Sequence, residues 1–211
     1  MNKILLTWMV ILGFSCKITA VKSSSSEFIP ITSVNELYFD IGLNRLMSFV
    51  SFTKVMEGYK KYSNDKPIVA ICDFSKPSNQ VRFFVVDLQN KKVLIKSYVA
   101  HGKNSGDLMA THFSNIPESL QSSLGFYRVG AAIHNVKHGL SLELDGLEPG
   151  LNDNARIRGI IMHGASYVSE SFVNNYGYTG KSFGCPALPN ALMPAVVSLL
   201  KDGALLYICN E

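Results

Sequence analysis

The most informative stretch of the sequence is Ser182-Phe183-Gly184-Cys185-Pro186. Its cysteine follows a glycine and precedes a proline, and both residue types are typical of turns. A thiol in a turn can reach a substrate, and its thiolate is a strong nucleophile when a neighbouring imidazolium lowers the thiol pKa. Cys185 is therefore a candidate nucleophile. The alternative is a structural cysteine in a Gly-Pro turn.

A histidine lies 22 residues upstream, at the end of an apolar run, in Ile160-Ile161-Met162-His163-Gly164-Ala165. The end of a strand is a rigid position for a general base, so His163 is the candidate base for the Cys185 thiol. Gly164 permits a tight turn there, and its carbonyl could accept a hydrogen bond from the imidazole and fix the tautomer. The alternative is a histidine of the core or its rim.

The residues around the cysteine suggest how charge is stabilised during attack. Gly184 lets the backbone approach a substrate closely, and the N–H groups of Gly184 and Cys185 could point at a developing oxyanion. Ser182 is expected either to hydrogen-bond within the turn or to assist the thiol.

The N-terminus has the pattern of an export signal. Lys3 precedes an apolar run from Ile4 to Phe14, and Ile18-Thr19-Ala20 offers a cleavage site. The run is shorter than the roughly 20 residues of a membrane span. Residues 1–20 are predicted to be a signal peptide and 21–36 a polar spacer. The protein is then exported to the periplasm or cell envelope, and a lipoprotein at Cys16 is the alternative.

Charge gives little support for a nucleic acid partner. Lys3 and Lys17 lie in the predicted signal, so the mature chain keeps 18 of the 20 basic residues against 16 acidic ones. This small excess is dispersed along the sequence, which argues against nucleic acid and against strong attraction to a membrane surface. No transmembrane span is expected in the mature chain.

Cys72 and Cys209 both lie in apolar, strand-like runs. They are expected to be buried small apolar residues, and a Cys72–Cys209 disulfide is the alternative.

The remaining pattern is mainly β with flanking helices. Apolar spacing predicts one helix, straight or bent, over about 41–62, and shorter helices over 169–175 and 191–201. Pro194 requires the last helix to begin close to it, and Gly203 is expected to end it. Seven short strands with Gly, Asn and Pro turns predict an α+β domain built on a sandwich or partly open barrel. These strands are expected at 68–74, 81–87, 93–100, 124–129, 140–144, 157–163 and 204–209.

Three other features have weaker chemical interpretations. His134 and His138 are four residues apart, but no further ligand follows at metal spacing, so zinc is disfavoured. The loop His101-Gly102-Lys103 lacks P-loop spacing and is either a plain turn or a substrate-side loop. The acidic segment 145–154 lacks EF-hand spacing and is interpreted as loop.

Taken together, the His-Gly strand end and the Ser-x-Gly-Cys turn resemble the murein L,D-transpeptidase catalytic domain, in a divergent branch. The likeness runs from about Leu37 to the C-terminus, so 37–211 is expected to be one catalytic domain. It implies a sandwich-like fold, a Cys185 nucleophile, a His163 base oriented by the Gly164 carbonyl, and peptidoglycan stem peptides as substrate. It implies no metal or organic cofactor.

Two departures from the family pattern affect the polar contacts to substrate. Phe183 stands where common members carry a second histidine, and Pro186 and Ala187 stand where an arginine or asparagine is usual. The expected activity is acyl transfer through a thioester. An L,D-carboxypeptidase using the same residues and a non-catalytic wall-binding domain are the alternatives. The order histidine before cysteine argues against papain-like wall endopeptidases.

Overall fold

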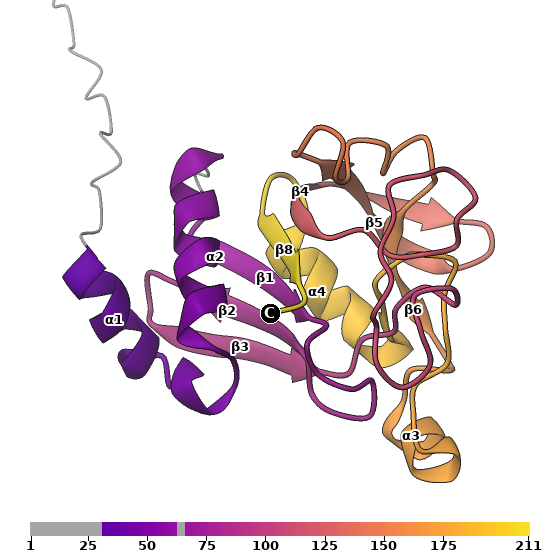
Figure 1. The fold of residues 1–211 in the computed structure, drawn as a ribbon, viewed down its shortest axis with the longest axis horizontal. Coiled ribbons are helices and arrows are strands. Elements are labelled where there is room, and N and C mark those ends of the chain that lie inside the picture. The colour runs from indigo at the N-terminus through magenta and orange to yellow at the C-terminus, as the bar shows by residue number, and fades with distance from the viewer. Residues whose placement is uncertain (1–30, 63–65) are drawn as a thin grey trace, which may run out of the picture.

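The computed structural model describes residues 31–62 and 66–211, which form one mixed sheet flanked by helices (Figure 1). The strand order is β3-β2-β1-β8-β4-β5-β6-β7, with β1–β8 and β6–β7 parallel and the other pairs antiparallel. A bridge between Ala100, just after β3, and Ala187 of β7 links the two edges. The sheet is thus nearly closed and barrel-like, as the predicted α+β class requires. Its strands are β1 Ile68–Asp73, β2 Phe83–Asp87, β3 Lys92–Ser97, β4 Gly125–Asn135, β5 Gly139–Gly146, β6 Ile161–Ala165, β7 Ala187–Pro189 and β8 Leu205–Cys209.

Two apolar clusters cover opposite faces of β1 and β8, because side chains alternate along a strand. Val69 and Ile71 pack with α2 (Phe49–Lys61), whereas Ala70 and Cys72 pack with α4 (Met193–Leu200). The faces of β8 alternate in the same way, and Cys209 lies in the α2-side cluster. Cys72 and Cys209 are both buried free thiols on different faces, so the disulfide alternative is wrong.

The single helix predicted over 41–62 is wrong in its extent. Gly42 takes a left-handed φ of 77°, a short 3-10 turn follows at Leu43–Arg45, and α2 begins only after Ser48. Ser48 caps α2 by accepting a hydrogen bond from the Ser51 N–H at 3.0 Å. A separate helix, α1 (Ile31–Asp40), precedes this break and was not expected.

The short helices follow the prediction more closely. Helix α3 (Glu170–Tyr176) is capped by Ser169, and Pro194 lies in the first turn of α4, after a 3-10 turn at Asn190–Leu192. Helix α4 ends at Leu200 with Lys201 as its C-cap, and Asp202 rather than Gly203 is the first left-handed residue after it. The strand predicted over 157–163 begins later, at Ile161, because the preceding residues form turns that end at Gly159.

The predicted signal peptide and Cys16 lie outside the described residues. Helix α1 begins inside the segment 21–36 that was expected to be spacer, and the domain limits stay a prediction. Across 31–62 and 66–211, no helix has the length and hydropathy needed to cross a bilayer.

Candidate active site

The pairing of β6 with β7 brings the predicted base and nucleophile to neighbouring strands. His163 is in parallel register with Ala187, two residues beyond Cys185. The backbone N–H of Ile161 donates to Sγ of Cys185 at 3.5 Å. Ile161 and His163 are two residues apart on β6 (Ile161–Ala165), so the sulfur lies beside the strand that carries the imidazole.

His163 is held in a single tautomer. Its Nδ1–H donates to the carbonyl oxygen of its neighbour Gly164 at 2.9 Å, as predicted, which leaves Nε2 as the proton acceptor. The side chain is 2% exposed, and burial is the main cause that lowers the pKa of His163 below 6.5. The imidazole is therefore a neutral base at neutral pH.

Gly164 lies inside β6 rather than in a turn, but a glycine is still required. A Cβ at this position would lie 2.5 Å from Oδ1 and 3.1 Å from Cα of Asn190. The close approach of the 3-10 turn before α4 thus disfavours a larger residue, which would have to displace the Asn190 side chain and shift the turn slightly.

Cys185 is a buried thiol in this structure, at 9% exposure. Burial raises the pKa of the Cys185 thiol, and the Ile161 N–H and the positive charge of Arg158 offset part of that rise. The S–H is directed to the carbonyl oxygen of Gly159, with 3.9 Å between sulfur and oxygen. The resting pair is therefore a neutral thiol and a neutral imidazole.

Ser182 builds the turn that carries the cysteine. Its Oγ accepts from the Gly184 N–H at 3.1 Å and donates to the Cys185 carbonyl at 2.6 Å. The first of the two alternatives for Ser182, a bond within the turn, is the one observed. Gly184 has φ of 120°, where side chains are strained, and a Cβ would lie 2.7 Å from the Gln121 carbonyl oxygen.

This turn changes the expected oxyanion site. The Gly184 N–H is already engaged by Ser182, whereas the Cys185 N–H has no acceptor within the described parts of the chain. The structure therefore leaves one free amide beside the sulfur where the sequence predicted two.

The loop at His101 is hydrogen-bonded to the segment that carries Ser182 and Cys185. The Ser182 N–H donates to the His101 carbonyl at 3.0 Å, and the Lys103 N–H donates to the Ser182 carbonyl at 2.8 Å. The His101 ring is 1% exposed; its Nδ1 accepts from Arg82 Nη2 at 2.8 Å and its Nε2–H donates to the Gly106 carbonyl at 3.1 Å. Burial and the Arg82 charge lower the pKa of His101 to about 4. His101 is thus a neutral structural histidine.

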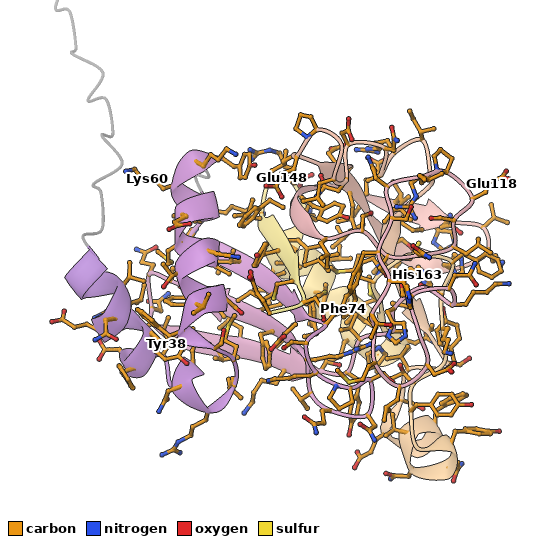
Figure 2. All side chains as sticks on the ribbon, in the orientation of Figure 1. Tyr38, Lys60, Phe74, Glu118, Glu148 and His163 are labelled. Atoms are coloured by element: carbon orange, nitrogen blue, oxygen red, sulfur yellow. The ribbon has the colours of Figure 1, made fainter. Side chains whose placement is uncertain are left out.

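The sequence prediction missed three residues near this pair. Arg158 Nη1 donates to the Ser114 carbonyl at 2.7 Å and to Ser123 Oγ at 2.8 Å, which places a guanidinium beside the Cys185 turn. His138 stacks on His163, and Lys137 lies over Phe183. No local sequence signal identifies these contacts, because they join segments distant in the chain. Figure 2 labels His163 among the strands and loops that surround it.

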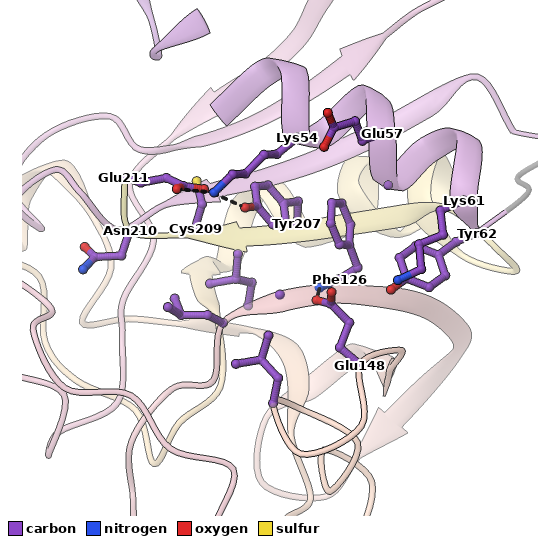
Figure 3. Close-up of a pocket in the computed structure, with 15 residues that line it drawn as sticks. Lys54, Glu57, Lys61, Tyr62, Phe126, Glu148, Tyr207, Cys209, Asn210 and Glu211 are labelled. Atoms are coloured by element: carbon purple, nitrogen blue, oxygen red, sulfur yellow. Dashed lines mark hydrogen bonds and ion pairs between the residues drawn. The ribbon is translucent and has the colours of Figure 1, made fainter. Parts of the chain in front are cut away.

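A hollow on the described surface lies elsewhere, between α2 and the β4–β8 pair (Figure 3). It has a volume of about 480 Å³, and Glu211 in its wall pairs with Lys54 and accepts a hydrogen bond from the Tyr207 hydroxyl at 3.0 Å. It belongs to the α2 side of the sheet, whereas Cys185 packs in the α4-side cluster. We do not assign the catalytic chemistry to it.

No metal centre is evident in the described parts of the chain, where no three His, Cys, Asp or Glu side chains gather as ligands. His134 lies on β4, while His138 lies in the turn after that strand. The two therefore do not share a helical face.

Comparison with known proteins identifies the class. Residues 44–209 match the family model of the L,D-transpeptidase catalytic domain, so the chain belongs to that family. No curated protein gave a sequence match.

Solved structures of L,D-transpeptidases are among its structural neighbours. One from Mycobacterium smegmatis has 14% identity and a TM-score of 0.42, over 68% of this chain and 58% of that one. The helical cell shape determining protein Pgp2 from Campylobacter jejuni has 17% identity and a TM-score of 0.43, over 75% and 53%. An L,D-transpeptidase from Stackebrandtia nassauensis has 12% identity and a TM-score of 0.41, over 84% and 76%. The chain thus spans little more than half of the first two proteins.

Proposed function

We propose that this protein is an L,D-transpeptidase that transfers acyl groups between peptidoglycan stem peptides through a Cys185 thioester. The observation that carries the proposal is the tautomer of His163: Nδ1–H is bound to the Gly164 carbonyl, so Nε2 is left as the proton acceptor on the strand that pairs with the Cys185 segment. Membership of the L,D-transpeptidase catalytic domain family supports the same chemistry.

The first half-reaction forms the thioester. Sγ of Cys185 attacks the carbonyl carbon between an L-configured centre and the terminal D-residue, while Nε2 of His163 takes the thiol proton. The Cys185 N–H donates to the oxyanion of the tetrahedral intermediate. The C–N bond then breaks, and the His163 imidazolium gives its proton to the departing amine.

The second half-reaction releases the acyl group. An amine of another stem peptide attacks the thioester carbonyl and loses a proton to His163. The C–S bond breaks, and the sulfur recovers that proton as the thiol. Water in place of the amine gives L,D-carboxypeptidation with the same residues and the same proton transfers.

Cys185 and His163 are both neutral at rest, so the thiol proton has to move during the reaction. Because burial raises the thiol pKa and lowers the imidazole pKa, the proton passes from sulfur to Nε2 as the substrate binds and is attacked. Exclusion of water by the substrate strengthens both the hydrogen bond to Nε2 and the bond to the oxyanion.

The test is a product analysis with a disaccharide tetrapeptide as donor, with and without a second stem peptide as acceptor. Mass spectrometry is expected to show loss of the terminal D-residue and a cross-linked product that depends on the acceptor. A trimmed peptide without cross-links in the presence of the acceptor identifies a carboxypeptidase. An intact donor in every reaction supports a non-catalytic wall-binding domain instead.

We further propose that residues 1–20 direct export, so that the domain acts in the periplasm or cell envelope. The charged start, the apolar run and the small residues up to Ala20 support this. N-terminal sequencing of protein recovered from the envelope fraction is expected to begin at Val21. An N-terminus at Met1, or a lipid-modified Cys16, would contradict this cleavage site.

A further inference from the structure

The turn between β4 and β5, residues 136–138, is built to hold two side chains against the active site. The side-chain oxygen of Asn135 accepts from the N–H of Lys137 at 2.9 Å and from the N–H of His138 at 3.0 Å. Gly139 follows with a left-handed φ of 67° and pairs with Asn135. This turn is therefore fixed from within, and its side chains project in defined directions.

The second of these side chains contacts the proposed base. The His138 and His163 rings are stacked, with centroids 3.8 Å apart and 26° between the ring planes. The β5–β6 pairing of Ser141 with His163 holds the hairpin beside β6. One edge of the His163 ring is already fixed by the Gly164 carbonyl, and the stack constrains its face. Together they leave Nε2 one orientation.

The first side chain contacts the residue that replaces the family's second histidine. The ammonium of Lys137 lies 5.3 Å from the centroid of Phe183, and the ammonium of Lys103 lies 5.3 Å from the same centroid. Phe183 is 59% exposed and stands two residues before Cys185. Two cations are thus presented on one aromatic ring, next to the nucleophile, from two different loops.

Neither ammonium has an acidic partner among the described residues, although other lysines nearby do. Lys181, for example, is paired with Asp107. Two ammonium groups without acidic partners beside one ring make the local potential positive, which favours binding of an anion there. A stem peptide carries free carboxylates, which are ligands of the required charge and size.

From these contacts we infer that two side chains of the β4–β5 turn belong to the active site: His138 positions the His163 imidazole, and Lys137 together with Lys103 binds a carboxylate of the donor peptide. The inference rests on the proposed function for the identity of the peptide. His138 is a positioning residue, since it acts through His163, whereas Lys137 and Lys103 form a binding subsite. The two roles predict different kinetic defects from adjacent residues.

Substitutions at His138 test the positioning role. His138→Ala is expected to lower kcat about tenfold with less than a twofold change in KM, because the loss lies in orientation of the base and not in binding. His138→Phe keeps an aromatic face and is expected to recover most of kcat. Val136→Ala is the matched control, since Val136 is in the same turn and fully exposed.

Two results would overturn the positioning role: wild-type kcat in His138→Ala, or a kcat in His138→Phe as low as that in His138→Ala. Thermal unfolding of all three variants separates a folding defect from a catalytic one. A ring-current shift of the His163 proton signals, present in wild type and His138→Phe and absent in His138→Ala, reports the stack independently of turnover.

Substitutions at the lysines test the subsite. Lys137→Gln and Lys103→Gln are each expected to raise KM for the free-acid tetrapeptide about tenfold while kcat changes less than twofold. For a tetrapeptide with amidated carboxylates, wild type and both variants are expected to share the same raised KM. Lys181→Gln, whose ammonium already has an acidic partner, is the control and keeps the wild-type KM.

An unchanged KM in both lysine variants, or an amidated peptide that binds wild type as well as the free acid, would overturn the subsite. Failure of the proposed function gives a different result, because wild type then makes no product from either peptide. In that case, binding of the free-acid peptide to the Cys185→Ala protein, measured by calorimetry with and without Lys137→Gln, still decides on the subsite. Tighter binding in the presence of Lys137 upholds it, and equal binding refutes it.

Discussion

Ser182 shows how one side chain sets the geometry of the nucleophile. Its buried hydroxyl makes both a donor and an acceptor bond across the turn that ends at Cys185. Ser182→Ala leaves the Gly184 N–H and the Cys185 carbonyl without these partners, at a cost of about 1–3 kcal/mol in the free energy of unfolding. The rate of Cys185 acylation is expected to fall as well, because the sulfur is no longer held in place. Denaturant unfolding and acylation by a carbapenem measure the two effects.

The control for this substitution is Ser171→Ala, in an exposed position of α3. It is expected to change the free energy of unfolding by less than about 0.5 kcal/mol. Equal stability and equal acylation in Ser182→Ala and wild type would show that the turn does not depend on this hydroxyl.

His101 gives the protein a pH-dependent stability. Its pKa is about 4 in the folded state against 6.5 ordinarily, so the unfolded chain binds a proton between these values that the folded protein does not. Stability is therefore fully present above pH 6.5 and is lost as pH falls toward 4, by about 2–3 kcal/mol. In His101→Gln, whose amide can still accept from Arg82 and donate to Gly106, the His101 part of this slope is expected to be lost, while the part that comes from the lowered pKa of His163 stays. Urea unfolding between pH 4 and 7 measures it.

His112→Gln is the matched control, because the His112 ring is exposed. It is expected to keep the wild-type dependence on pH. A His101→Gln protein that loses stability in acid as steeply as wild type would place the pH-sensitive group elsewhere.

Among the elements, α2 supports the sheet from the face that lies away from the nucleophile. Phe52 is fully buried in the cluster between α2 and the sheet, whereas Cys185 packs in the cluster on the other face. Phe52→Ala is expected to lower the free energy of unfolding by about 3–5 kcal/mol. Cys185 acylation in the folded protein is expected to stay within about twofold of wild type. Phe49→Ala, at a partly exposed position of the same helix, is expected to lower the free energy of unfolding by less than Phe52→Ala does. A large loss of acylation in folded Phe52→Ala would mean that α2 controls the site directly.

The sequence predicts these elements well where the apolar pattern is long and its boundaries carry local signals. The strand cores of β1, β2, β3 and β8 follow the expected runs, and Ser169 caps α3 as expected. The helix over 41–62 failed because apolar spacing continues across a break that depends on the left-handed Gly42. Strand β7 has only three residues and exists through its pairing with β6, so no periodicity could reveal it.

At the scale of the whole molecule, the nearly closed sheet determines which residues of the site meet. The β6–β7 pairing joins His163 to the Cys185 segment, and the Ala100–Ala187 bridge brings the His101 loop behind it. The sequence predicted the bond between the His163 imidazole and the Gly164 carbonyl, because a His-Gly pair at a strand end is a local signature. The catalytic roles of Cys185 and His163 stay predictions. The sequence could not predict the stacking of His138 or the engagement of the Gly184 amide, which depend on contacts made only after folding.

The nearly closed sheet also explains why the resting thiol of Cys185 is not ionised. Closing the sheet buries Cys185 and His163 together, which raises one pKa and lowers the other. In the proposed mechanism this neutral pair persists until a substrate binds, and activity requires His163 to be unprotonated. The acid limb of the kcat/KM profile is expected below pH 6.5. A limb at or above that value would contradict the neutral buried base.

The central claim is that Cys185 is acylated with His163 as its base, and intact-protein mass spectrometry with a carbapenem or stem peptide tests it most directly. Wild type is expected to gain one acyl mass, mapped to the peptide that contains Cys185. Cys185→Ala is expected to gain none, and His163→Gln to gain it about 100-fold or more slowly. An undiminished adduct in Cys185→Ala, or wild-type acylation kinetics in His163→Gln, would contradict the account.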